Sequence, residues 1–324
     1  MPTPSKTEIG YSSRKRVKLK GRDFLRLQDF TAEEIWAILK LSKKLKKTRG
    51  RSAARPLRRK NVALLFEKPS TRTRVSFELA VAELGGTPIY LSRAETQLGR
   101  GETIADTARV LSRYLHLIMA RVYRFETLEE LAEAADIPVV NGLSDINHPL
   151  QTLADLLTMW ERFRRLRGLN VAWIGDGNNV CNSLLIAASK LGINVKAAVP
   201  EGYEPLESFL RDAEANARLS GAEVAIVREP EDAVRDADVV MTDVFVSMGQ
   251  EEEREQRLRV FLPRYQVNGE LMAKAKPTAI FMHPLPAHRG EEVTDEVIDS
   301  PSSAVWDQAE NRLHTAKALL SLLL

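Results

Sequence analysis

Short apolar runs alternate along the chain with longer segments in which apolar residues recur every three or four positions. The runs predict strands at residues 62–66, 87–91, 117–120, 139–141, 170–174, 196–199, 223–226, 239–242, 279–282 and 304–305. The longer segments predict helices, among them 104–114, 127–135, a long helix from about Pro149 and a last helix from about Asn311. Helices that alternate with short strands are typical of a parallel α/β protein.

The length of 324 residues favours two cores over one. We therefore predict an α/β fold of two doubly wound parallel-sheet domains joined by interdomain helices, with the first domain over 1–150 and the second over 151–310. The last helix, about 311–324, ends in the apolar letters LLSLLL, so we expect it to pack back on the first domain.

The composition limits the choice of partners and of compartment. Hydrophobic residues make up 44% and charged residues 28% of the chain, and the net charge is only +3, so no nucleic-acid surface and no membrane segment are expected. The single cysteine, Cys181, excludes an internal disulfide and fits a reducing, cytoplasmic location. The basic N-terminus suggests a transit peptide or a short exposed arm; Glu8 and Asp23 interrupt it and favour the arm.

The stretch FEKPSTRTRVSFELA at residues 66–80 reads as a strand end, a turn and a helix start. The unpaired N–H groups of a first helical turn, with hydroxyls and arginines beside them, favour an anion and above all a phosphate. A plainer interpretation is also open, in which Ser70 is an ordinary N-cap and Arg74 pairs with Glu78 one turn later.

The loops after the next three predicted strands carry further polar residues. They offer Gln97, Arg121, and the pair His148 and Gln151, which share one helix face. Because the loops at the carboxyl ends of parallel strands meet at one edge of a sheet, we expect them to form one pocket. Its donors suit a small anionic molecule with a carbonyl-like end, whose oxygen a histidine can stabilise as charge develops.

The second half adds candidates for another substrate. The stretch WIGDGNNVCNS resembles a dinucleotide-binding turn, but Val180 stands where the third glycine belongs. Asn179 suits a carboxylate instead, and Asp243 follows a strand and suits an ammonium group. The letters after Asp243, VFVSMGQ, indicate a mobile loop, and the turn HPLP at 283–286 can hold a cis peptide bond and fix carbonyl directions.

Five motifs in order, STRTR, HPLQ, Asp-x-x-x-Ser-Met-Gly, HPLPAHRGEEV and AENRLHT, resemble the aspartate/ornithine carbamoyltransferases. The resemblance runs from about Phe24 to the C-terminus, and the Ser-Met-Gly loop marks the ornithine branch. It implies transfer of a carbamoyl group from carbamoyl phosphate to ornithine, giving citrulline, with neither metal nor organic cofactor. It also implies a homotrimer or an assembly of trimers, and leaves open whether the chain serves arginine biosynthesis or ornithine-yielding catabolism.

The resemblance also implies roles for individual residues. Those implied for carbamoyl phosphate are Ser70, Thr71, Arg72, Thr73, Gln97, Arg121, His148, Gln151, Pro284, Leu285 and Arg312. Those implied for ornithine are Asn179, Asp243, Ser247 and Met248, and those implied for catalysis are Arg72, Arg121, His148, Gln151 and Asp243. Gln97 would serve its own site or that of a neighbouring subunit.

One position departs from the ornithine branch, which usually reads His-Cys-Leu-Pro where this chain has Pro284 after His283. Proline has neither thiol nor N–H. Either the thiol is dispensable, which the retained Ser-Met-Gly loop favours, or the acceptor is another amine, such as putrescine, lysine or an N-acylated ornithine. A non-catalytic relative and a nucleotide-dependent oxidoreductase are further alternatives, but the oxidoreductase leaves STRTR and HPLQ unexplained.

Overall fold

The computed structural model describes residues 17–51, 54–247 and 249–324. The first sixteen residues of the basic N-terminus and Met248 of the expected mobile loop therefore lie outside the described residues. The strands are β1 (Asn61–Phe66), β2 (Thr87–Ser92), β3 (Leu117–Arg121), β4 (Val139–Leu143), β5 (Asn170–Ile174), β6 (Asn194–Ala198), β7 (Val224–Val227), β8 (Val239–Thr242) and β9 (Ile280–Met282). Among the described residues, no helix combines the length and apolar character that crossing a membrane requires.

Helices follow nearly every strand, as the alternating pattern predicts. The α-helices are α1 (Ala32–Lys47), α2 (Thr71–Glu83), α3 (Ile104–Tyr114), α4 (Phe125–Ala134), α5 (Pro149–Phe163), α6 (Asn179–Leu191), α7 (Glu207–Ser220), α8 (Pro230–Val234), α9 (Arg254–Phe261), α10 (Gly269–Met272), α11 (Asp295–Ile298) and α12 (Val305–Leu323). The short 3₁₀ helices are η1 (Leu27–Asp29), η2 (Arg93–Glu95), η3 (Gln97–Arg100) and η4 (Glu251–Glu253).

Two parallel sheets result, so the predicted α/β fold is confirmed. The first has the order β2-β1-β3-β4 and the second the order β7-β6-β5-β8-β9. In both sheets the chain reverses its direction of winding next to the first strand, between β1 and β3 and between β5 and β8. Ligands bind at such switch points, beyond the carboxyl ends of the strands.

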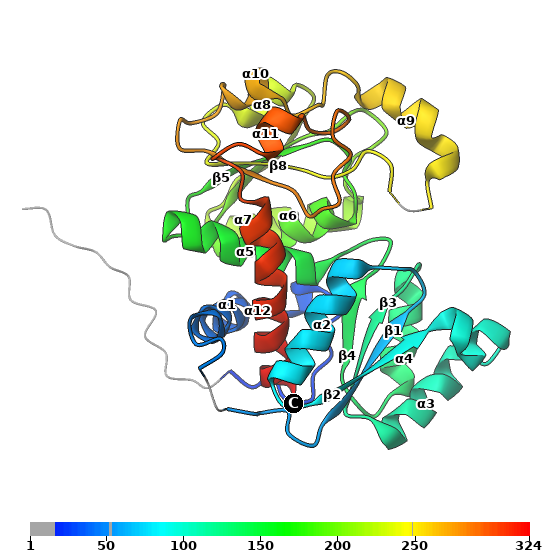
Figure 1. The fold of residues 1–324 in the computed structure, drawn as a ribbon. Coiled ribbons are helices and arrows are strands. Elements are labelled where there is room, and N and C mark those ends of the chain that lie inside the picture. The colour runs from blue at the N-terminus through cyan, green and yellow to red at the C-terminus, as the bar shows by residue number, and fades with distance from the viewer. Residues whose placement is uncertain (1–16, 52–53, 248) are drawn as a thin grey trace, which may run out of the picture.

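Both faces of the first sheet are covered, which explains why its strands read as continuous apolar runs. Along β1, Val62, Leu64 and Phe66 face one core cluster, whereas Ala63 and Leu65 face another. The alternation follows from the strand's period of two. In Figure 1, α3 and α4 cover one face of this sheet, and α2 and α12 lie on the other.

Helices α5 and α12 connect the two sheets. Helix α12 starts beside the second sheet and runs down between α1 and α2, and it packs against α1, α2 and α5 (Figure 1). It begins at Val305, six residues before the predicted start. The predicted strand at 304–305 is wrong: the chain makes a single bridge between Phe281 and Ser303 at the edge of β9, and the helix then begins.

Candidate active site

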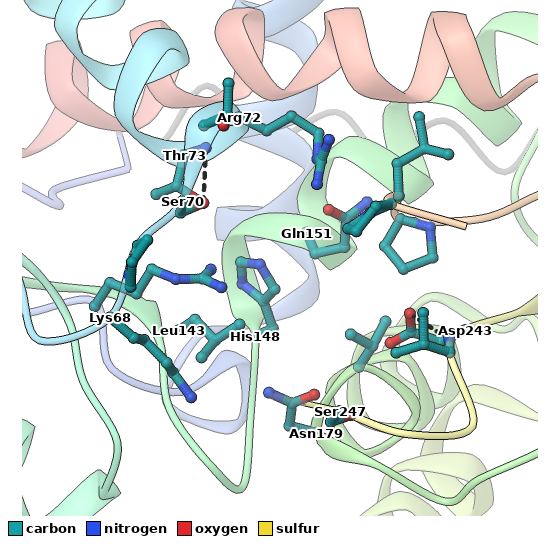
Figure 2. Close-up of a pocket in the computed structure, with 18 of the residues that line it drawn as sticks. Lys68, Ser70, Arg72, Thr73, Leu143, His148, Gln151, Asn179, Asp243 and Ser247 are labelled. Carbon is teal, nitrogen blue, oxygen red and sulfur yellow. Dashed lines mark hydrogen bonds between the residues drawn. The ribbon is translucent and has the colours of Figure 1, made fainter. Parts of the chain in front are cut away.

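The stretch that begins α2 forms one wall of a cavity of about 350 Å³ between the two sheets. Strand β1 ends at Phe66 and α2 begins at Thr71, with Ser70 as the N-cap whose hydroxyl accepts a hydrogen bond from the Thr73 N–H at 3.3 Å (Figure 2). Arg74 turns away and pairs with Glu78 at 2.9 Å. The plainer interpretation therefore holds for Ser70 and Arg74, while Ser70 to Thr73 still line the cavity.

Cationic side chains from separate elements converge on this wall. Arg72 comes from α2, Arg121 from the end of β3 and Arg312 from α12, and all three line the cavity. The pairing of β3 with β4 shifts register between Ala120 and Arg121. Burial, reinforced by the neighbouring Arg72, lowers the pKa of Arg121 to about 10. Burial, reinforced by Arg121, lowers that of Arg312 to about 9. Like charges held this close favour an anion between them.

His148 stands at the N-terminus of α5 and is held by its backbone, whose N–H donates to the Ser183 hydroxyl at 2.8 Å. Burial first, and then the charges of Arg312 and Arg121, lower the pKa of His148 well below its usual value. The ring is therefore neutral near pH 7. Its buried Nδ1 has no hydrogen-bond partner, so one ring nitrogen is free to meet a substrate.

Gln151, one turn further along α5, ties three helices together. Its side-chain oxygen accepts from Nη1 of Arg312 at 2.5 Å, and its amide nitrogen donates to Asp155 at 2.8 Å. Arg312 also donates to the Thr73 hydroxyl at 3.1 Å. This network fixes α2, α5 and α12 relative to one another at the cavity.

The opposite wall comes from the second sheet and carries a carboxylate. Asp243 follows β8, and its side chain accepts hydrogen bonds from the Asn178 amide and the Val244 N–H, both at 2.8 Å. Burial raises the pKa of Asp243. Asn179 donates to the Ser144 carbonyl at 2.7 Å, and Ser247 lies beside it in the cavity (Figure 2).

The turn after β9 closes the cavity with Pro284 and Leu285. Nδ1 of His283 accepts from the Leu285 N–H at 2.9 Å, and Nε2 of the same ring faces Glu292 at 3.0 Å. Leu285 has φ +56°, a left-handed conformation that a non-glycine residue adopts only when its surroundings fix it. The Leu285–Pro286 peptide bond is cis. The turn thus presents a backbone carbonyl in a fixed direction.

Two family models match the chain in succession. Residues 22–161 match the description "Aspartate/ornithine carbamoyltransferase, carbamoyl-P binding domain", and residues 167–323 match "Aspartate/ornithine carbamoyltransferase, Asp/Orn binding domain". The chain belongs to the aspartate/ornithine carbamoyltransferase family. Its members transfer a carbamoyl group, so the chain is a carbamoyltransferase.

Individual relatives of the family match over nearly the whole chain. An ornithine carbamoyltransferase of Pyrococcus abyssi is 58% identical over 310 residues, which are 95% of this chain and 97% of that protein. One of Bacillus subtilis is 52% identical over 95% of this chain and 96% of its own length. The solved ornithine carbamoyltransferase of Pyrococcus furiosus superposes with a TM-score of 0.92 at 57% identity, covering 95% of this chain and 98% of its own.

The structure brings most of the residues that the family resemblance implied into one cavity. Its lining includes Ser70, Thr71, Arg72, Thr73, Arg121, His148, Gln151, Asn179, Asp243, Ser247, Pro284, Leu285 and Arg312. Gln97 is not part of this lining; it begins η3 on the loop after β2. Met248 lies outside the described residues.

Sequence reasoning missed three polar contributors, one of which is His288, in the cavity lining after the Leu285 turn. Lys68 is buried at the cavity, beside Leu143 and His148 (Figure 2), and burial lowers its pKa to about 8. It belongs to the quoted FEKPSTRTR stretch, where its position one residue before a proline gives no sign of burial. Asn178 orients Asp243.

The turn that suggests dinucleotide binding has a packing explanation. A Cβ on Gly177 would stand 2.2 Å from the backbone nitrogen of Pro205, so glycine is required there by close approach of two backbones. Asn178 then caps α6, accepting from the N–H groups of Val180 and Cys181. The side chain of Asn178 thereby fills the helix N-terminus that a pyrophosphate would need.

Proposed function

We propose that this chain transfers the carbamoyl group of carbamoyl phosphate to the side-chain amine of L-ornithine, giving L-citrulline and phosphate. The observation that carries the proposal is one cavity with a cationic helix N-terminus on one wall and the Asp243 carboxylate on the other. Arg72 and Asp243 lie close enough to interact through their charges. Such a cavity accommodates an anion and an amino group side by side.

The phosphate would lie at the start of α2. The N–H groups of the first turn, the hydroxyls of Ser70, Thr71 and Thr73, and the guanidinium of Arg72 supply donors there. These groups also favour the leaving phosphate, whose charge increases as the bond to carbon breaks.

The carbamoyl group would lie next to α5. Arg121, His148 and the Thr73 hydroxyl surround the position of its oxygen, which becomes an oxyanion when the amine attacks. A neutral His148 donates a hydrogen bond there without giving up a proton. The carbamoyl nitrogen is a donor and would need acceptors, which the side-chain oxygen of Gln151 and the backbone carbonyl of Leu285 supply.

The amino acid would lie against the second sheet. Asp243 would hold the α-ammonium group, and Asn179 and Ser247 the carboxylate. The neutral side-chain amine then attacks the carbonyl carbon, and its proton leaves with the phosphate. Neither metal nor organic cofactor takes part in this reaction, and holding both substrates in contact supplies much of the rate.

Pro284 is the residue that bears most directly on which amine is the acceptor. It lines the cavity, so this departure from the family pattern lies in the wall of the proposed substrate site. We propose ornithine because Asn179, Asp243 and Ser247 all remain around the cavity. Another amine acceptor is the second candidate, favoured only by Pro284.

We further propose a homotrimer, or an assembly of trimers, in the cytoplasm. Large apolar side chains are exposed on α2 and α3: Val75, Leu79, Val110 and Tyr114. Exposed apolar surface of this kind is suited to contact between subunits. The single cysteine suits a reducing compartment. The Pyrococcus furiosus relative at 57% identity is named as anabolic, and we propose the synthetic direction, toward arginine, here too.

The test is an acceptor panel. Purified protein is given carbamoyl phosphate with ornithine, putrescine, lysine, N-acetylornithine or aspartate, and both phosphate release and ureido product are measured. We expect strong turnover with ornithine alone. Turnover with a different amine would overturn the acceptor, and no turnover with any acceptor would overturn the activity.

Two variants test the proposed role of Arg72 in binding the phosphate. Arg72→Ala should lower kcat/KM by about a hundredfold or more, the scale seen when one donor to a developing charge is removed. Arg211→Ala removes an exposed arginine that pairs with Glu207 and is not part of the cavity lining, so it should leave turnover unchanged. Near-normal activity of Arg72→Ala would sink the phosphate assignment.

A further inference from the structure

The segment that follows the Leu285 turn brings three unpaired side-chain atoms together. They are Nδ1 of His288, Oε2 of Glu291 and Oε2 of Glu292, and they all lie within 4.8 Å of one another. Nδ1 of His288 is 3.7 Å from the Glu291 oxygen and 4.0 Å from the Glu292 oxygen. Each atom is shielded from solvent and has no hydrogen-bond partner.

Glu292 makes this arrangement unfavourable as it stands. Its side chain is fully buried, and its Oε1 already accepts from the His288 backbone N–H at 2.6 Å and faces Nε2 of His283 at 3.0 Å. Oε2 of the same carboxyl group has no hydrogen-bond donor. Leaving a buried acceptor unpaired costs stability, so the position suits a cation.

The neighbouring cations do not supply it. Arg254 contacts Glu291 through the other carboxylate oxygen, Oε1, which leaves Oε2 of Glu291 directed at the cluster. Arg289 is engaged by Asp295 and Asp299. The separations of 3.7 and 4.0 Å from His288 exceed hydrogen-bond length. Within the described part of the chain, the three atoms thus face one another around a space that none of these groups fills.

We propose that His288, Glu291 and Glu292 form a binding site for a divalent first-row transition metal, with Zn²⁺ as its representative. One imidazole nitrogen and two carboxylate oxygens suit Zn²⁺, because imidazole is a weak ligand for Mg²⁺ or Ca²⁺. Ligand atoms at about 2.0–2.2 Å from one tetrahedral ion lie about 3.3–3.6 Å apart. Binding therefore requires the Glu291 and Glu292 oxygens to approach His288 from 3.7 and 4.0 Å, and the three atoms to close from separations of up to 4.8 Å. The His288 side chain is 42% exposed, which gives the ion an entry path and room for a water ligand.

The site touches the carbamoyl-transfer cavity without belonging to its chemistry. Glu292 contacts His283, which holds the backbone of Leu285, and His288 itself lines the cavity. A bound cation would therefore clamp the segment between Leu285 and Glu292. The proposed reaction needs no metal, so binding at this site can be measured without substrates and stands apart from the proposed function.

Binding is tested on protein dialysed first against a chelator and then titrated with Zn²⁺ by calorimetry and equilibrium dialysis. We expect one Zn²⁺ per chain. Glu291→Gln and His288→Asn should each weaken its affinity by at least tenfold, and Glu214→Gln should leave the affinity unchanged because Glu214 is an exposed glutamate elsewhere. Arg254→Met removes the competing cation from Glu291, and it should tighten binding several-fold.

A second readout follows the same variants. Zn²⁺ should raise the Tm of the parent protein, and it should raise that of Glu291→Gln much less. The Tm of each variant without metal shows whether it folds. Equal Zn²⁺ affinity of the parent and the Glu291→Gln and His288→Asn variants, or no binding by the parent, would overturn the site.

Discussion

The pKa of Lys68 depends on its burial and on neighbouring side chains, neither of which could be predicted from the sequence. Burial lowers its pKa to about 8, and the positive charge of Arg121 acts in the same direction. Its ammonium group also lies 5.0 Å from the ring centre of Tyr123. At neutral pH most Lys68 groups are charged, and this charge is lost as the pH rises through 8. We therefore propose Lys68 as a fourth cation for the phosphate, with a pKa of about 8.

We therefore expect phosphate to bind more weakly as the pH rises from 7.5 to 9.5. Lys68→Met should weaken phosphate binding at pH 7.5 by about tenfold or more, the scale of one hydrogen bond to a charged group, and should reduce the change between the two pH values. Calorimetric titration with inorganic phosphate at both pH values measures this, with Lys20→Met, an exposed lysine, as the control. An unchanged pH profile in Lys68→Met would contradict the assignment.

The part of the cavity lining at the start of α2 could be predicted from the sequence because it lies at one junction of strand and helix. Hydroxyls and an arginine at a helix start suit an anion wherever that helix lies. The contact between His283 and Glu292 could not be predicted in this way, because it joins two turns through the buried core. The departure at Pro284 could be read from the sequence, but its place in the cavity wall depends on how the second sheet faces the first.

Helix α12 is an element that could be predicted from the sequence only in part. Its apolar end and its packing could be expected from LLSLLL, but its start could not. The apolar pair at 304–305 predicted a strand, whereas the chain makes only one bridge to β9, at Ser303, before the helix begins. That helix packs against α1, α2 and α5. Polar contacts bind α12 to α5 as well: Gln308 donates to Asp155 at 2.7 Å.

Asp155 makes the contact between α5 and α12 sensitive to pH. Burial raises its pKa to about 7, although the amides of Gln151 and Gln308 act against the shift. The folded state keeps this proton up to about pH 7, whereas the unfolded chain loses it near the ordinary value of an aspartate. Folding therefore takes up a proton between these values, and this contribution to stability is lost as the pH rises.

We expect Asp155→Asn to lose less stability than the parent between pH 5 and 8, by about 1–3 kcal/mol, since one pKa unit corresponds to about 1.4 kcal/mol. Urea unfolding of both proteins at the two pH values and one protein concentration measures the difference. Asp136→Asn, at an exposed aspartate, serves as the control and should follow the parent. Parallel pH dependence of the parent and Asp155→Asn would refute this account.

At the scale of the whole molecule, the two sheets turn their switch points toward each other. Beyond the carboxyl ends of β1 and β3 lie Arg72, at the start of α2, and Arg121, the last residue of β3. Beyond those of β5 and β8 lie Asn179, the first residue of α6, and Asp243. Each half alone is an ordinary doubly wound sheet. The alternating pattern predicts the two sheets, but their mutual placement depends on α5 and α12, whose buried contacts no local pattern reveals.

Gln97 provides a test of whether neighbouring subunits share an active site. It lies outside the cavity of its own chain, and we expect it to complete the site of a neighbouring subunit.

Arg72→Ala and Gln97→Ala should each be nearly inactive alone. When the two are unfolded, mixed in equal amounts and refolded, about a quarter of the shared sites should combine an intact Arg72 from one subunit with an intact Gln97 from the next. Turnover measured after mixing should therefore rise to about a quarter of that of the parent protein. A mixture of Arg72→Ala and His148→Ala should regain no activity, because both residues belong to the cavity of the same chain. If Gln97 served its own chain, neither mixture would regain activity, and light scattering would then show whether a trimer exists at all.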